Sequence, residues 1–271
     1  MHVTIESNSM AKQNRTIIRH DVRSKNGNEY NATRSQETCI MKQNEITLAE
    51  FVKKFASIKK QGWVPSARRG PTGIGQTLEQ LLALKENNIA LPDLGTVELK
   101  AHRIGSSSLI TLFTFNRKAW KMKPLDAIRQ YGTPDENGRL GLYYTMSRTP
   151  NSMGLFLYLE SETISVRHIS GTVIAEWQIE TLCERFVQKI PGLVLVSAFN
   201  ELRGDTEWFK FDRAQLLSET SPEIIRNQII TGNILIDLRL HDKGTSARNH
   251  GTGFRATEDK LTFLFKNVQD I

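Results

Sequence analysis

Six short runs of β-branched and aromatic residues constrain the fold of this chain more than any other feature of its sequence. Each run has the length of a strand and falls far short of a membrane span. Helical spacing of apolar residues occurs before and between these runs. The pattern predicts an α/β protein in which helices flank a mixed β-sheet. The strand-like runs cover residues 96–99, 109–115, 154–159, 173–177, 193–199 and 234–240, and the helical patterns cover 46–60, 76–86, 179–189 and 222–230.

The first 45 residues differ in composition from the rest of the chain. They are rich in Asn, Gln, Ser and Thr and poor in aromatic residues, as expected of an arm outside a packed core. We therefore predict an N-terminal arm of unknown role over residues 1–45 and one folded domain over residues 46–271. The start of the chain lacks the apolar stretch of a secretory signal. Cys39 and Cys183 lie too far apart to indicate a disulfide framework or a cysteine-built zinc site. These features predict a cytoplasmic protein that does not bind membranes.

The charge balance favours a polyanionic partner such as nucleic acid. Lysine and arginine total 36 against 29 acidic residues, which gives a net charge of +7. Residues 51–77 and 100–123 contain several basic side chains and no acid at all. A solvated protein face has the same composition, so charge alone does not establish nucleic-acid binding.

The segment 91–103 concentrates acidic and basic residues in an order suited to catalysis. Gly95 permits a turn after Asp93, so that a strand can begin immediately beyond it. Side chains alternate along a strand, and Glu98 and Lys100 therefore share one face. The alternative is an ordinary amphipathic edge strand whose charged side chains are solvated.

The residue types in this segment match the needs of phosphodiester hydrolysis. Asp93 and Glu98 can bind Mg²⁺, which prefers oxygen ligands, and the backbone carbonyl of Leu99 can add a third ligand. Lys100 can then orient the attacking water or neutralise charge that develops on the phosphate. Glu79, on the preceding predicted helix, is either an accessory acid behind this site or a solvated charge.

Two blocks of the sequence resemble the MvaI/BcnI family of type II restriction endonucleases, a branch of the PD-(D/E)xK nucleases. The first block covers Gly62–Arg103, and the second covers Asp237–Arg255, about 135 residues later. The resemblance implies a PD-(D/E)xK core with a catalytic part around residues 62–130 and a DNA-recognition part around residues 232–256. It implies as catalytic residues Asp93, Glu98, Lys100 and, as an accessory acid, Glu79.

The resemblance also implies an activity and its partners. The implied enzyme is a monomer that uses one or two Mg²⁺ ions to cut double-stranded DNA at a short GC-rich site. It is expected to be paired functionally with a cognate DNA methyltransferase. The mismatch-repair nicking endonuclease MutH looks like a more distant relative, and a strand-nicking DNA repair endonuclease is therefore the alternative among enzymes. In the MutH pattern, however, the first two acids are further apart than Asp93 and Glu98. A DNA-binding module with a vestigial nuclease site is the alternative from another class, and the intact acids and Lys100 argue against it.

The second block has the chemistry of base recognition. Asp237 and Arg239 share one face of a strand, where the carboxylate can accept from cytosine and the guanidinium can pair with guanine. The alternative is a surface hairpin that touches only phosphates. His102 is either a DNA contact or a partly buried structural histidine. The predicted DNA contacts are Arg68, Arg69, His102 and Arg103 in the first block and Asp237, Arg239, Arg248, His250 and Arg255 in the second.

The segment 70–77 approximates a phosphate-binding loop but departs from it at a decisive position. Gln76 stands where such loops require lysine, and no strand pattern precedes the segment. We therefore expect it to begin the helix that carries Glu79.

Overall fold

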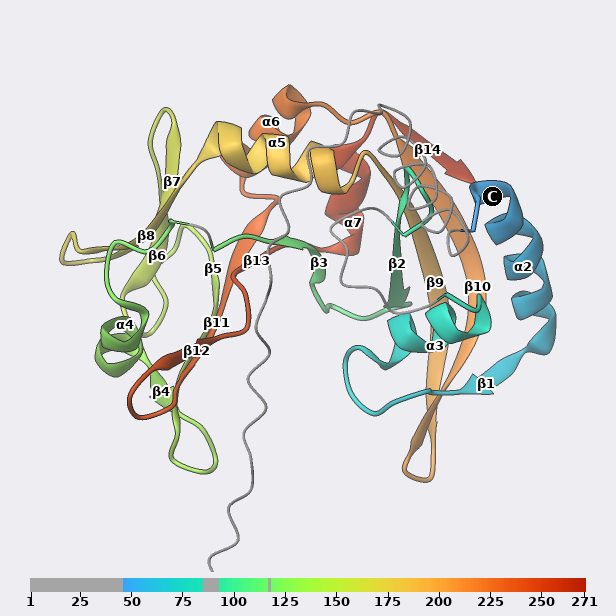
Figure 1. Cartoon of the computed structure of the whole chain (residues 1–271), viewed down its shortest axis with the longest axis horizontal. Helices are drawn as coiled ribbons and strands as arrows, with labels where there is room; N and C mark the ends of the chain where they lie inside the picture. The colour runs from blue at the N-terminus through green and yellow to red at the C-terminus, as the bar shows by residue number, and fades with distance from the viewer. Residues whose placement is uncertain (1–45, 85–92, 117) are drawn as a thin grey trace, which may run out of the picture. The chain divides into compact units, whose positions relative to one another are not determined.

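The computed structural model describes residues 46–84, 93–116 and 118–271, and strands in these ranges form three sheets (Figure 1). The first sheet has the order β1–β10–β9–β2, and β14 pairs with another part of β10. β2 runs parallel to β9 and the other pairs are antiparallel, so the sheet is mixed, as predicted. Its strands are β1 (Trp63–Pro65), β2 (Glu98–Arg103), β9 (Gly192–Arg203), β10 (Thr206–Ser218) and β14 (Asn267–Asp270).

The second and third sheets are wholly antiparallel. The second has the order β3–β13–β11–β5–β4, with β12 paired to β11, and the third has the order β6–β7–β8. The second contains β3 (Ile110–Thr114), β4 (Thr133–Pro134), β5 (Leu140–Met146), β11 (Leu235–Asp242), β12 (Ala247–Asn249) and β13 (Gly253–Ala256). The third contains β6 (Leu155–Leu159), β7 (Thr163–His168) and β8 (Val173–Gln178).

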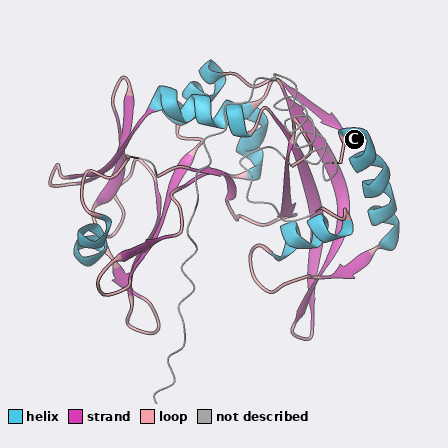
Figure 2. Ribbon diagram, viewed as in Figure 1, coloured by secondary structure: helices cyan, strands magenta, loops and turns pink. Residues whose placement is uncertain are grey.

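Helices flank these sheets (Figure 2). Thr47 and Glu50 form a capping box that fixes the start of α2, because each side chain accepts a hydrogen bond from the other's backbone N–H. Gly232, at a φ of 80°, ends α6 in the left-handed conformation. None of the helices in the described ranges is long and apolar enough to cross a membrane. The helices are α2 (Leu48–Gln61), α3 (Gly73–Leu81), α4 (Pro124–Tyr131), α5 (Ile179–Lys189), α6 (Pro222–Thr231) and α7 (Glu258–Leu261), followed by the 3₁₀ turn η2 (Thr262–Leu264).

The strand β9 separates two hydrophobic cores. Val194 and Val196 pack with apolar side chains of α2 and α3, whereas Leu193 and Leu195 belong to the core that includes α5 and the other two sheets. A strand buried on both faces has a continuous apolar sequence, which is why residues 192–199 show no polar alternation. β2 pairs with β9 and is the edge strand of this sheet among the described residues.

Candidate active site

The side chains of β2 divide between the two faces of the sheet. Leu99 is buried in the core with α2 and α3. Glu98 and Lys100 share the opposite face, where Lys100 Nζ donates to Glu98 Oε1 at 2.6 Å. This is the arrangement that the alternation of the sequence predicts.

Asp93 reaches the same strand from the turn that precedes it. Gly95 takes a φ of 73°, a conformation that glycine adopts without strain, and the turn brings Asp93 Oδ2 to 3.1 Å from the Leu99 N–H. The N–H and C=O of one strand residue point to the same side. The Leu99 carbonyl is therefore directed to the side of β2 away from β9, the side from which Asp93 approaches.

Asp93 and Glu98 have different electrostatic surroundings. Burial, reinforced by the negative charge of Glu98, raises the pKa of Asp93. Glu98 is 2% exposed and pairs with two ammonium groups, Lys100 Nζ on Oε1 and Lys189 Nζ at 3.1 Å from Oε2. Although Oε2 has this ion pair, it has no hydrogen-bond partner within the described ranges of the chain.

These groups fit a hard divalent cation. Mg²⁺ takes oxygen ligands, is commonly held by one or two carboxylates and keeps several waters. Asp93, Glu98 and the Leu99 carbonyl supply such a set, and a cation there would relieve the repulsion between the two acids. Three or more His, Cys, Asp or Glu side chains do not gather at any one place in the described part of the chain, so the carbonyl is needed to complete a protein-derived triad.

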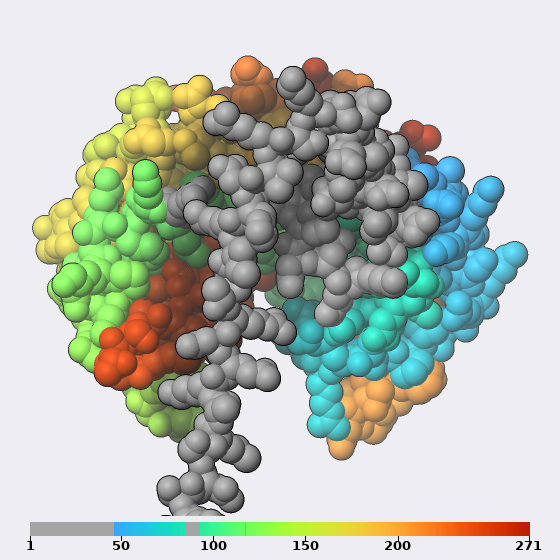
Figure 3. Space-filling model, viewed as in Figure 1, coloured from blue at the N-terminus to red at the C-terminus, as the bar shows by residue number. Residues whose placement is uncertain are grey.

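A cavity of about 770 Å³ brings the two distant blocks of the sequence together. The space-filling view shows the surface hollowed between the segments near residues 68 and 245 (Figure 3). Arg69 lies instead at a neighbouring pocket, and Arg248 is exposed on β12. Asp93 and Glu98 do not line the cavity themselves, whereas Leu99 does. The other predicted residues that line it are Arg68, Glu79, Lys100, His102, Arg103, Asp237, Arg239, His250 and Arg255.

Asp237 organises two arginines on the far wall of this cavity. Its Oδ2 accepts from Arg239 Nε and, at 2.9 Å, from Arg255 Nη1, while Oδ1 accepts from Thr145 at 3.0 Å. Arg255 is held a second time, because its Nη2 donates to the Leu109 carbonyl at 2.6 Å. The arginine side chains therefore have defined positions before any ligand arrives.

His250 belongs to a chain of rings beside these arginines. Its Nε2 lies 3.2 Å from His241 Nδ1, which in turn lies 3.0 Å from the Tyr143 hydroxyl. Burial, together with cations such as Arg139, lowers the pKa of His241. His241 and Tyr143 were not among the predicted site residues.

The structure distinguishes His102 from Arg103. His102 is 8% exposed, and its Nε2 lies 2.8 Å from Ser197 Oγ and 3.2 Å from Glu258 Oε1. Burial lowers the pKa of His102, against the opposing influence of Glu258. Arg103, on the other face of β2, pairs with Glu207, which sequence patterns did not indicate. Of the two interpretations of His102, the partly buried structural histidine describes its surroundings better.

Lys189 is the clearest residue that the sequence did not identify. It ends α5, which leads directly into β9, and the parallel pairing of β2 with β9 sets Glu98 opposite Leu193. This strand order brings the end of α5 to the carboxylate. A lysine at the end of a helix is otherwise common, because it complements the helix dipole.

Comparison of the sequence with family models identifies one family. Residues 52–265 match the model of the MvaI/BcnI restriction endonuclease family. The structure titled "Restriction endonuclease MvaI-cognate DNA substrate complex" is similar, with a TM-score of 0.67, 25% identity and coverage of 80% of this chain and 95% of that one. The structure of "Restriction endonuclease MvaI in the absence of DNA" has a TM-score of 0.46 and 24% identity over 83% and 97% of the two chains. A comparison with curated proteins found no match.

Proposed function

The chain belongs to the MvaI/BcnI restriction endonuclease family, and from this premise we propose that it hydrolyses double-stranded DNA at a short GC-rich site with one or two Mg²⁺ ions. One observation carries this proposal above all. Lys100, beside the carboxylate pair, and Arg239 and Arg255, beside Asp237, line one cavity although they come from opposite ends of the folded chain. A duplex in that cavity would meet hydrolytic and base-recognising chemistry together.

The proposed hydrolytic step assigns one task to each side chain. Asp93, Glu98 and the Leu99 carbonyl would hold Mg²⁺, which supplies Lewis-acid stabilisation of phosphate charge and a lower pKa for bound water. Lys100 donates to the attacking water or to a phosphate oxygen, and its partner Glu98 holds the ammonium in place. Glu79 lines the cavity from α3 and is the accessory acid.

The proposed recognition step depends on preorganised arginines. A guanidinium can donate two parallel hydrogen bonds to guanine O6 and N7, which favours G·C pairs. Asp237 holds Arg239 and Arg255. Arg248 lies on β12, and His250 directly follows that strand. Arg68 and Arg69 are suited to phosphates, which carry no sequence information.

Family membership supports three further parts of the proposal. One copy of the chain binds the short GC-rich site and cuts both strands. The enzyme acts in the cytoplasm, where a cognate DNA methyltransferase protects the host's own sites. Gel filtration of the protein with a cognate duplex would test the first of these statements, and a 2:1 complex would contradict it.

Digestion of an unmethylated plasmid of known sequence tests the activity. With Mg²⁺ we expect double-strand fragments whose mapped ends share one short sequence. Asp93→Ala should abolish cleavage and retain specific binding in a gel shift, because it removes a metal ligand and no DNA contact. Ca²⁺ should support binding with little cutting, since its looser coordination suits catalysis poorly. Nicks without double-strand cuts, or full cleavage by the Asp93→Ala protein, would contradict the proposal.

A further inference from the structure

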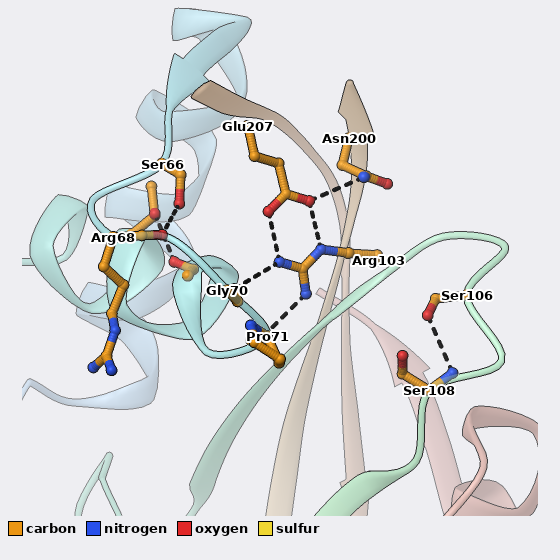
Figure 4. A network of polar contacts seen from close by, with 11 residues as sticks. Ser66, Arg68, Gly70, Pro71, Arg103, Ser106, Ser108, Asn200 and Glu207 are labelled. Atoms are coloured by element: carbon orange, nitrogen blue, oxygen red, sulfur yellow. Dashed lines mark hydrogen bonds and ion pairs between the residues drawn. The ribbon is translucent and has the colours of Figure 1, made fainter. Parts of the chain in front are cut away.

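Arg103 is held in place at the cavity by contacts on two sides (Figure 4). Its Nε and Nη2 donate to the two carboxylate oxygens of Glu207, each at 2.7 Å. On the other side, Nη1 donates to the Pro71 carbonyl at 3.1 Å and Nη2 to the Gly70 carbonyl at 3.3 Å. The guanidinium also lies 5.3 Å from the ring centroid of Phe209. This set of contacts joins β2, β10 and the segment before α3.

The segment of residues 66–72, called the clamp loop below, is closely folded upon itself. Ser66 Oγ donates to the Arg68 carbonyl at 2.6 Å, and the Ala67 N–H donates to Thr77 Oγ1 of α3 at 2.9 Å. A Cβ at position 73 would lie 2.5 Å from the Arg68 carbonyl oxygen, so Gly73 permits an approach that other residues would prevent. The clamp loop is therefore coupled to the first turns of α3.

Residues of the clamp loop and of α3 face the cavity. Arg68 lines it, and Arg68 Nη1 donates to Gln76 of α3 at 3.2 Å. Glu79 lines the cavity one turn further along the same helix. A displacement of the clamp loop would consequently move a predicted phosphate contact and the accessory acid together.

We propose that Arg103 is a positioning residue that holds the clamp loop against β10, and so places Arg68 and α3 at the cavity. This role rests on the proposed function, in which the cavity binds DNA. It differs from the direct DNA contact that the sequence predicts for Arg103. Glu207 and the two carbonyls engage the Nε, Nη1 and Nη2 atoms, and a lysine ammonium cannot reproduce such a planar fork.

A double-mutant cycle separates positioning from direct contact. Binding of a cognate duplex would be measured in Ca²⁺ at several salt concentrations for Arg68→Ala, Arg103→Ala and the double variant. If Arg103 acts through Arg68, the double variant should bind no more weakly than the weaker single variant, and all three should lose about one unit of salt slope. If the double variant instead lost affinity by the product of the two single losses, and its salt slope fell by about two, Arg103 would be a separate phosphate contact. That result would overturn the proposal.

Glu207→Gln gives a second test, because a direct phosphate contact by Arg103 and a positioning role predict different changes in function. The substitution removes a negative charge and loosens Arg103, so a direct phosphate contact should be unchanged or strengthened. A positioning role predicts slower single-turnover cleavage at saturating enzyme, by roughly tenfold or more, because small displacements of catalytic groups are costly. Arg103→Lys should be slowed similarly. Unimpaired cleavage by both variants would overturn the proposal, and this test remains available if Arg103→Ala does not fold.

Asp270→Asn is the matched control. Asp270 accepts from Arg213 Nε at 2.7 Å and Nη2 at 3.0 Å, a bidentate pair on the same sheet in which neither residue lines the cavity. This variant should leave the cleavage rate and salt slope unchanged, and equal slowing would show a general loss of stability and overturn the proposal. Lys100→Ala tests the proposed function separately, since the binding cycle does not depend on hydrolysis.

Discussion

Two strands of this protein carry the same pattern, an acid followed two residues later by a base, and use it differently. In β2 the pair is Glu98 and Lys100, and in β11 it is Asp237 and Arg239. The acid is nearly buried in both pairs, with side-chain exposures of 3% and 6%. The base is partly exposed in both, at 27% and 50%. Sequence spacing therefore does not explain the difference between the two sites.

The partners of each acid explain it. Asp237 accepts from two guanidinium groups and a hydroxyl, which fixes the arginines and satisfies the carboxylate. Glu98 pairs with two lysines, and one of its oxygens has no hydrogen bond in the part of the chain that the structure describes. A second acid, Asp93, is close enough for Glu98 to raise its pKa. The β11 carboxylate is suited to hold protein side chains in position, and the β2 carboxylate is suited to accept a cation. The first arrangement holds opposite charges together, and the second places two acids close to each other.

The largest expected effect is on the cleavage rate, after substitution of the base in the β2 pair. Lys100→Ala should reduce the cleavage rate by about 10²–10³-fold, because a donor to the developing charge is lost. Magnesium titration should show nearly unchanged metal affinity, and DNA binding should persist. Lys121→Ala, which removes an exposed partner of Glu176 from the same acid-free stretch, is the control and should retain the rate. If high Mg²⁺ restored the Lys100→Ala protein, its role would be metal binding instead.

A corresponding change in β11 should affect stability. Asp237→Ala leaves Arg239 and Arg255 without their carboxylate, and breaking such a pair costs on the order of 3–5 kcal/mol when it is buried. Because Arg239 is half exposed, we expect the lower end of this range. Asp270→Ala breaks an exposed pair and should cost under about 1 kcal/mol. Urea unfolding measures both, and equal losses would remove the distinction between the two pairs.

Strong local patterns in the sequence located most of the elements on which this comparison depends. The expected strands at 193–199 and 234–240 correspond to β9 and β11, and the expected helix at 179–189 has the bounds of α5. The expected strand at 96–99 overlaps only the start of β2, which continues to Arg103. β10 was missed. A register shift between Phe211 and Arg213 interrupts its alternation, and a strand without a steady period of two is hard to recognise.

Within the site, the sequence predicts contacts between residues close together in the chain and misses contacts between residues far apart. Glu98 and Lys100 are two residues apart on one strand, so the sequence alone places them together. Glu207 and Thr145 are separated from Arg103 and Asp237 by 104 and 92 residues. Their pairing follows from strand order and register, which periodicity does not encode.

Substitution of Arg255 would test whether the β11 side reads bases. A bidentate arginine–guanine contact contributes about 1–3 kcal/mol of discrimination. Arg255→Ala should therefore weaken cognate binding much more than random binding, and relax preference at one base pair. Arg68→Ala should weaken both duplexes alike and reduce the salt slope by about one. A uniform, salt-dependent loss for Arg255→Ala would make that residue a phosphate contact.

The smallest expected effect is a gain in stability from Asp93→Asn, opposite in sign to the loss expected for Asp237→Ala. Burial and the charge of Glu98 raise the pKa of Asp93, so in metal-free protein the folded state holds this proton more tightly than the unfolded state. As pH rises, the unfolded chain ionises first, and stability falls until the folded carboxyl has also ionised. Asp93→Asn removes this loss and keeps an acceptor for the Leu99 N–H.

In EDTA, Asp93→Asn should therefore raise the melting temperature at neutral pH, and the gain should shrink as pH falls toward the ordinary range of an aspartate. A gain of about 1 kcal/mol corresponds to roughly 2–4 °C for a domain of this size. Mg²⁺ should stabilise the natural protein by mass action and the variant much less. Melting curves between pH 4 and pH 8 measure these differences. A variant less stable than the natural protein at every pH would show that Asp93, like Asp237, is held by the fold rather than repelled within it.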